Sequence, residues 1–185
     1  MIARVIAVAL VVLASLFTAG CSALSSVPAH TSHGRIVSIA DGDTVTVRLD
    51  SGAEKSVRLL AIDSPEKYTT RYGSPAECGS LAASAFMERF DERRVVLISD
   101  PSQDGVDSYG RLLRYVQLEG GADLAAGALA RGLVMPYVYD MPAHRYARYR
   151  SLALAARAAD RGSWGLPCRG DFHSSLAGVQ DGLDG

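Results

Sequence analysis

The stretch DGDTVTVRLDSGAEKSVRLLAIDSPE, residues 41–66, decides the fold of this chain. Within it, TVTVRL (44–49) alternates strictly between polar and apolar residues, and EKSVRLL (54–60) is a second short strand-like run. Asp-Gly-Asp precedes the first run and Asp-Ser-Gly separates the two, and both triplets are typical of turns. With GRIVSI (34–39) ahead of them, the pattern predicts a meander of three antiparallel strands.

Further patterns continue downstream of this meander. They predict a helix at 79–90, strands at 94–98 and 112–118, a short helix at 124–131, an extended segment at 134–140 and a longer helix at 142–161. Ser80 and Asp123 are the expected N-caps of the first two helices, and Gly132 and Gly162 are expected to end the last two. Five short strands with a helix between the third and the fourth predict an α+β fold that is mainly β, an OB-fold five-stranded barrel plus three helices.

The N-terminal residues predict a targeting signal rather than part of the fold. Arg4 precedes the apolar run VIAVALVVLASLF (5–17), and small residues then lead to Cys21. A run this short is typical of a secretory signal peptide and not of a membrane-spanning helix. The ending Ala-Gly-Cys resembles a bacterial lipoprotein signal, which implies a lipid on Cys21 and anchoring at the extracytoplasmic face of a membrane. Thr18 stands where such signals usually have Leu, so ordinary secretion is the alternative.

Composition divides the chain into four parts. We expect a signal peptide at 1–20, a flexible tether at 21–32, one globular domain at 33–169 and a polar, disordered tail at 170–185. With Cys21 assigned to the lipid, Cys78 and Cys168 remain. An even pair of cysteines in an exported protein favours a disulfide, and two buried free thiols are the alternative.

The charge of the chain is nearly balanced, with 19 Lys and Arg against 20 Asp and Glu. A protein that binds nucleic acid tightly along its backbone usually carries an excess of basic residues. This balance argues against such a clamp. It permits a hydrolase whose phosphate contacts are few and local.

Three short motifs place acidic and arginine side chains at strand ends and turns. They are DGDT (41–44), RLLAIDSPE (58–66) and DSYGR (107–111). Asp43 and Asp63 can hold a hard divalent cation through carboxylate oxygens, because adjacent antiparallel strands bring such ends together. Asp41 can assist as an indirect ligand, although ordinary turn chemistry also explains an Asp-Gly-Asp triplet.

The same motifs supply groups for phosphodiester hydrolysis. Glu66 can activate a water molecule, and the alternative is a surface glutamate in a loop. Arg58 and Arg111 can grip a phosphate with their planar guanidinium groups, and the alternative for either is a surface salt bridge. Together these residue types are the components of metal-assisted hydrolysis of a phosphodiester.

DGDT, then RLLAIDSPE, then DSYGR, in this order, resemble the staphylococcal (micrococcal) nuclease or thermonuclease family. The likeness runs from about residue 33 to 168 and implies a barrel followed by helices. It also implies that Asp43, Asp63 and the backbone carbonyl of Ser64 bind Ca²⁺. By the same resemblance, Glu66 activates the attacking water.

The resemblance further implies a phosphate clamp and a nucleotide pocket. Arg58 and Arg111 correspond to the clamp, and Tyr109 and Tyr137 to the pocket, whereas the role of Tyr139 stays open. Tyrosines can stack on bases without selecting a sequence. The family commonly has a lysine before the tyrosine of DSYGR, and Ser108 in its place predicts weaker substrate affinity.

The sequence therefore predicts an exported, monomeric, Ca²⁺-dependent endonuclease acting on DNA and RNA, with single strands favoured. A non-catalytic OB-fold module that binds nucleic acid is one alternative, and the intact set of acidic and arginine residues argues against it. A carbohydrate hydrolase that uses Glu66 and Asp63 is another. That reading leaves the two arginines unexplained.

Overall fold

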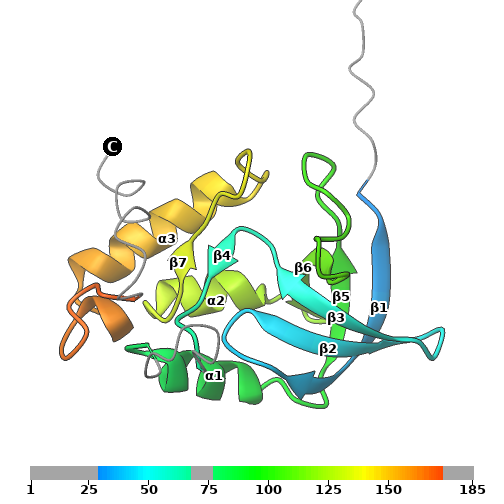
Figure 1. The fold of residues 1–185 in the computed structure, drawn as a ribbon, viewed down its shortest axis with the longest axis horizontal. Helices are drawn as coiled ribbons and strands as arrows, with labels where there is room; N and C mark the ends of the chain where they lie inside the picture. Colours follow the sequence, from blue (N-terminus) through cyan, green and yellow to red (C-terminus); the bar gives the residue numbers. More distant parts are fainter. Residues whose placement is uncertain (1–28, 68–76, 173–185) are drawn as a thin grey trace, which may run out of the picture.

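The computed structural model describes residues 29–67 and 77–172 (Figure 1). The predicted signal peptide, its Cys21 and the end of the predicted tail lie outside the described residues. Within the described ranges, no helix has the length and apolar character needed to cross a membrane.

The predicted barrel is confirmed. Its strands are β1 (Thr31–Ile39), β2 (Thr44–Leu49), β3 (Glu54–Leu59), β6 (Leu112–Leu118) and β5 (Arg94–Ile98), in this order around the closed sheet. Neighbouring strands are antiparallel except β3 and β6, which run parallel. Pairing of β1 with β5 closes the barrel, so none of these five strands is left as an open edge.

Alternation along the strands fills the barrel with apolar side chains. Val45 and Val47 of β2 and Val57 of β3 are fully buried, whereas Arg48 and its cross-strand partner Glu54, on the other face, are exposed. Each buried side chain of this size contributes roughly 1.5–3 kcal/mol relative to an exposed one. The period-two pattern that predicted the meander is therefore the pattern that builds the core.

Helices cover the barrel on one side. The described residues contain α1 (Ser80–Glu88), α2 (Leu124–Ala130), α3 (Tyr146–Ala158) and the 3₁₀ turn η1 (Gly162–Trp164). α2 lies between the barrel and α3 and packs against both α3 and β6 (Figure 1). A second, two-stranded sheet pairs β4 (Ile62–Asp63) with β7 (Met135–Pro136), beside the barrel.

Two helix starts differ from the prediction, while a third agrees with it. Asp123 caps α2 as expected, by accepting a hydrogen bond from the Ala126 N–H at 3.1 Å. Ser80 is not the N-cap of α1, because Gly79 takes that position with a φ of 86° and no side-chain cap. A Cβ on Gly79 would lie 2.0 Å from the hydroxyl oxygen of Ser163, so this close approach requires glycine. The last helix begins at Tyr146 rather than near residue 142.

Both predicted boundaries of the globular domain need correction. Thr31 and Ser32, assigned to the tether, belong to β1 and pair with Ile98 and Leu97 of β5. Phe172, assigned to the disordered tail, is fully buried, and its ring centroid lies 4.7 Å from that of Trp164. Burial of this one aromatic side chain holds the segment against the domain. The polar composition around Phe172 gave no sign of this contact.

The predicted pairing of Cys78 with Cys168 is present. The bridge joins residues 90 apart in sequence, with 5.6 Å between the two Cα atoms. It connects the segment before α1 to the segment after η1. Closing a loop of this length removes unfolded-state entropy worth up to about 4 kcal/mol in the chain-entropy model.

A buried carboxylate joins the barrel to the start of α3. The Asp100 side chain is fully buried and accepts hydrogen bonds from the Tyr115 hydroxyl, the Ser102 N–H at 2.9 Å and the His144 backbone N–H at 2.7 Å. Arg145 N–H in turn donates to the Tyr115 hydroxyl at 3.0 Å. These bonds hold residues 144 and 145 before the helix, which explains its late start. Burial alone would raise the pKa of Asp100, but the hydrogen bonds outweigh it and hold that pKa well below its usual range.

The depressed pKa of Asp100 predicts acid sensitivity. Its stabilisation is fully present above the unfolded carboxyl pKa of about 3.9 and is lost as the pH falls through the lower folded-state pKa. Asp100→Asn should lower the free energy of unfolding by about 2–4 kcal/mol at pH 7, because buried hydrogen bonds to a charge are lost. This deficit should shrink below about pH 4. Urea titrations at several pH values measure it, with the exposed Asp104→Asn as control. A deficit that does not change with pH would contradict the assignment.

Candidate active site

The centre of the site is the guanidinium group of Arg58, at the end of β3. Its Nη2 lies 2.7 Å from Oδ1 of Asp63, and its Nη1 lies 3.1 Å from Oδ2 of Asp43. The Arg58 side chain is only 14% exposed. Burial favours the neutral form of an arginine, but the charges of Asp43 and Asp63 outweigh this and raise the Arg58 pKa further. The arginine is therefore a permanent buried cation between two carboxylates.

A left-handed turn brings Asp63 back to Arg58. Ala61 has a φ of 61°, which is unusual for a residue with a side chain, and it reverses the chain between β3 and β4. Arg58 stabilises this turn, because its Nη1 also donates to the carbonyl of Ile62 at 2.8 Å. The backbone around Asp63 and the side chain that neutralises it are thus fixed by the same guanidinium.

Asp43 is held by the residues around it. Its Oδ1 accepts the hydroxyl hydrogen of Thr44 at 2.9 Å, and its Oδ2 accepts the N–H of Ser64 at 2.8 Å. Asp41 closes the preceding turn, since its Oδ1 accepts the N–H groups of Asp43 and Thr44. Turn chemistry at Asp41 and a functional position for Asp43 are therefore compatible: the turn is what places the carboxylate.

Acidic groups outnumber the guanidinium around Arg58. Burial, and next the charge of Asp43, raise the pKa of Asp41 to about 7. Partial burial and the charges of Asp43 and Asp63 also raise the pKa of Glu66. Four carboxylates, those of Asp41, Asp43, Asp63 and Glu66, act on the single charge of Arg58. The site therefore carries uncompensated negative charge.

This excess of charge bears on the predicted calcium site. The available donors are oxygens, which are the ligands that Ca²⁺ prefers, and their surplus negative charge suits a divalent cation. Asp43 and Asp63, with the backbone carbonyl of Ser64, therefore fit a hard cation in donor chemistry. Among the described residues, however, no group of three or more His, Cys, Asp or Glu side chains is already arranged to hold a metal ion.

Arg111 reaches the same region from the turn after residue 106. Its Nε donates to Oδ2 of Asp107 at 2.7 Å, and Oδ1 of Asp107 accepts the N–H groups of Tyr109 and Arg111. Burial opposes ionisation of Asp107, but these bonds outweigh it and lower its pKa. Arg111 Nη1 lies 3.5 Å from the hydroxyl oxygen of Thr44, which also bonds Asp43. Thr44 thus connects the DGDT motif to Arg111 of the DSYGR motif.

The predicted tyrosines differ in how they lie. Tyr137 is half-buried, donates its backbone N–H to the carbonyl of Ala61 at 3.0 Å, and has a pKa raised by burial and by the charge of Asp63. Tyr109 is 69% exposed, with its ring centroid 5.4 Å from the guanidinium carbon of Arg111. Tyr139 is 88% exposed. Tyr109 and Tyr137 therefore lie next to Arg111 and Asp63, respectively.

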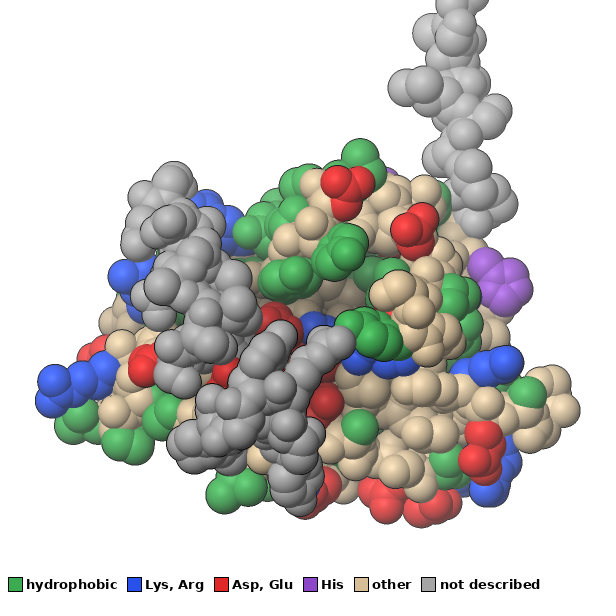
Figure 2. Space-filling model, viewed as in Figure 1, with side chains coloured by type: hydrophobic (Ala, Val, Ile, Leu, Met, Phe, Trp, Pro, Cys, Tyr) green, Lys and Arg blue, Asp and Glu red, His purple; other side chains and the backbone are tan. Residues whose placement is uncertain are grey.

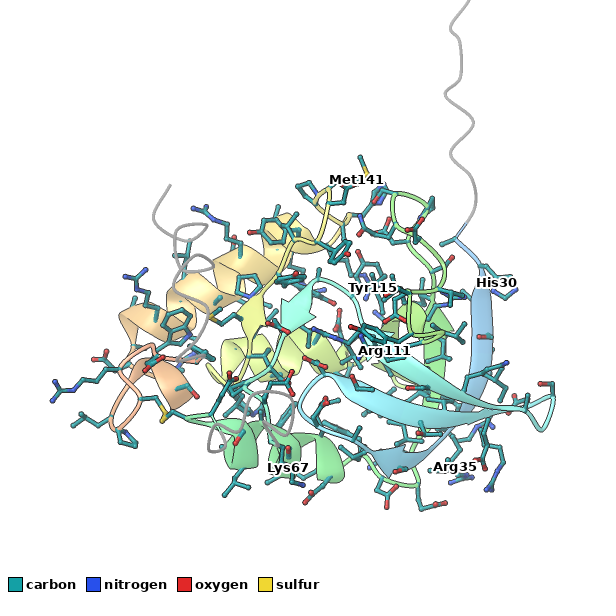
Figure 3. The ribbon with its side chains drawn as sticks, in the orientation of Figure 1. His30, Arg35, Lys67, Arg111, Tyr115 and Met141 are labelled. Atoms are coloured by element: carbon teal, nitrogen blue, oxygen red, sulfur yellow. A yellow bond between two sulfur atoms is a disulfide. The ribbon has the colours of Figure 1, made fainter. Side chains whose placement is uncertain are left out.

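Thr44 and Asp107 are the site residues to which the sequence analysis assigned no role. Thr44 closes DGDT and Asp107 opens DSYGR, so both lie inside the quoted motifs. A hydroxyl that bonds a predicted metal ligand, and a carboxylate four residues before a predicted phosphate ligand, were the available signals. Figure 2 shows acidic and basic side chains together in a hollow at the middle of this face. Figure 3 places Arg111 near the centre of the same view.

Comparisons with known proteins show which family the chain belongs to. The uncharacterized protein MJ1439 of Methanocaldococcus jannaschii is 28% identical over 107 residues, which cover 50% of this chain and 51% of that protein. The chain thus spans about half the length of the curated relative that it matches. The family described as staphylococcal nuclease homologue matches residues 56–165, which include Arg58, Asp63, Glu66 and Arg111. This chain belongs to the staphylococcal nuclease homologue family.

Proposed function

We propose that this chain is a Ca²⁺-dependent endonuclease that hydrolyses phosphodiester bonds of DNA and RNA with little sequence preference. The observation that carries the proposal is the buried Arg58 between Asp43 and Asp63, with the charge of Glu66 acting on it. Membership of the nuclease family supports the reaction class. The dependence on calcium, the range of substrates and the role of each residue are parts of the proposal.

Glu66 takes the proton of the attacking water. The raised pKa of Glu66 lies closer to neutral pH than the pKa of an ordinary glutamate, and a base works best when its pKa is near the working pH. One of its carboxylate oxygens orients the water and accepts the proton as oxygen attacks phosphorus. The P–O bond on the opposite side breaks at the same time, and the leaving nucleotide oxygen takes up a proton from solvent water. The alternative sequence interpretation, a surface glutamate, would not require neighbouring acidic charges.

Arg111 is the first phosphate ligand. Asp107 holds Nε, so the planar group is fixed before substrate arrives, while Nη1 lies on the side of Thr44. A fixed guanidinium can donate to two phosphate oxygens and stabilise the charge that grows on them. Because Ser108 replaces a commonly found lysine, this arginine supplies much of the local positive charge.

Arg58 has a second role besides phosphate binding. It already donates to Asp63 and to the carbonyl of Ile62 and lies against Asp43. To bind a phosphate oxygen in the transition state, it must use another of its five N–H groups or exchange one of these acceptors. We therefore assign Arg58 to holding the carboxylates in the ground state and to sharing the phosphate charge during attack.

Calcium, when bound, supplies positive charge that stabilises the transition state and favours ionisation of water. Asp43 and Asp63, with the backbone carbonyl of Ser64, would hold it. Tyr109 and Tyr137 contact the nucleotide, and stacking on an exposed aromatic ring such as that of Tyr109 accepts any base. Bases are accessible for stacking in single strands, which we therefore expect to be cleaved preferentially.

The direct test is hydrolysis of single-stranded DNA by the purified protein. We expect cleavage with Ca²⁺, none with excess chelator and poor cleavage with Mg²⁺, since Mg²⁺ demands tight octahedral geometry and releases water reluctantly. Double-stranded DNA and RNA should also be cut. Full activity in chelator would disprove the calcium dependence. Binding of DNA without cleavage under any metal would favour the non-catalytic OB-fold alternative.

Substitution separates the proposed roles. Glu66→Ala and Arg111→Ala should each lower kcat on the order of 10²-fold or more, as expected for loss of a group that acts in the transition state. Glu88→Ala and Arg48→Ala are matched controls, because both remove the same charges from exposed side chains in surface ion pairs. Circular dichroism should be unchanged in all four. Near-normal turnover of both site variants would refute the assignment.

We propose in addition that the chain is exported and held at the membrane by a lipid on Cys21. The Ala-Gly-Cys ending of the apolar segment supports this, and the Cys78–Cys168 bridge supports an oxidising compartment. Cys21→Ser should move the protein from the membrane fraction to the soluble fraction without reducing nuclease activity. Mass spectrometry of the mature protein checks the lipid. A mature chain without lipid would leave ordinary secretion as the explanation.

A further inference from the structure

Glu66 is bonded at its backbone to a residue outside the three motifs. The Glu66 N–H donates to Oε2 of Glu77 at 2.7 Å, and the Glu77 N–H donates to the carbonyl of Glu66 at 3.0 Å. The first bond ends on a carboxylate, and such charge-assisted bonds are shorter and stronger than those between neutral groups. The two reciprocal bonds fix the distance and the relative orientation of the two backbones.

Glu77 is itself anchored. The neighbouring Cys78 is joined covalently to Cys168. The carbonyl of Glu77 accepts the N–H of Ser80 at 3.1 Å, at the start of α1. Gly79 follows, with room for no side chain against Ser163. The Glu77 backbone is therefore tied both to α1 and, through the bridge, to the segment after η1.

Glu66 needs such an anchor because its own surroundings are open. The preceding Ser64 and Pro65 are buried, but Glu66 is exposed, so packing does not fix its side chain. Ser64 is held on one side by its bond to Asp43. The two bonds with Glu77 hold the backbone of Glu66 itself, one at its N–H and one at its carbonyl. Glu66 is the residue whose carboxylate must meet the water.

We propose that Glu77 is a positioning residue for the reaction, which fixes the backbone of Glu66 so that its carboxylate lies at a constant place beside Asp43 and Asp63. This inference rests on the proposed role of Glu66. Glu77 acts through Glu66 and not on the substrate, so its removal should affect turnover and leave substrate binding unchanged.

The experiment uses the protein as it is exported, purified in detergent because of the proposed lipid on Cys21, with single-stranded DNA and Ca²⁺. Glu77→Ala should lower kcat on the order of 10- to 100-fold, the effect of a small misplacement of a reacting group, with KM nearly unchanged. Glu77→Gln keeps an acceptor oxygen and should recover part of the loss. Glu88→Ala removes the same charge beside Lys67, which flanks Glu66, and should behave as the unsubstituted protein.

Two further measurements distinguish positioning from general damage. In a Glu66→Ala background, Glu77→Ala should cause no additional loss, because both changes remove the same contribution. Hydrogen exchange of the Glu66 amide should become faster in Glu77→Ala and stay slow in Glu88→Ala. If Glu77→Ala does not fold, the same comparison is made with Glu77→Gln.

The outcomes are separable. Normal kcat in Glu77→Ala, additive losses in the double variant, or unchanged exchange of the Glu66 amide would each overturn the positioning role. An unsubstituted protein without nuclease activity would overturn the proposed function, and with it the catalytic consequence of the anchor. Amide exchange would then still decide whether Glu77 fixes Glu66.

Discussion

The site depends on one buried charge, the guanidinium of Arg58. Taking a charge out of water is costly, and the cost is offset only where good partners surround it. Arg58 has Asp43 before β2, Asp63 on β4 and the carbonyl of Ile62. Removing the arginine would leave two mostly buried carboxylates without their main counter-charge, which typically destabilises a protein by roughly 3–5 kcal/mol. The same ion pairs therefore stabilise the fold and fix the positions of Asp43 and Asp63 in the candidate site.

Barrel closure determines which motifs meet at this charge. β3 and β6 run parallel, and Arg58 stands opposite Leu113 in their register. Arg111 lies two residues before Leu113, so the pairing brings the second arginine within two strand positions of the level of Arg58. The small β4–β7 sheet does the same for Tyr137, which follows Pro136, the partner of Ile62. Motifs far apart in sequence lie close together in space because the register of strand pairing fixes their positions.

Local patterns predicted the barrel because each strand carries its own signal. Alternation of polar and apolar residues predicted β2. Asp123 predicted the start of α2, because its side chain accepts a hydrogen bond from an N–H of the first helical turn. Apart from the Cys78–Cys168 bridge, which the number of cysteines favoured, features that depend on distant partners were not predictable. Gly79 as N-cap follows from the proximity of Ser163, and the burial of Phe172 follows from the position of Trp164. The candidate site was predictable only in part: its motifs named the acidic and arginine residues, but not the Thr44 and Glu77 contacts that connect them.

The two arginines are not equivalent, and this difference bears on how the site would work. Arg58 pairs with two carboxylates from different motifs and donates to a backbone carbonyl, whereas Arg111 pairs with Asp107, on its own turn. Under the proposed function, we therefore expect a phosphate to meet Arg111 first, because its side chain is the more exposed of the two, 30% against 14%. The carboxylates that a cation would need are the ones that Arg58 already neutralises, so the affinity of the site for metal and the position of Arg58 are linked. Asp43 and Asp63 already outnumber the single guanidinium of Arg58. Asp41 and Glu66, whose pKa values are raised by burial and next by the charge of Asp43, lie close enough to act on the same guanidinium.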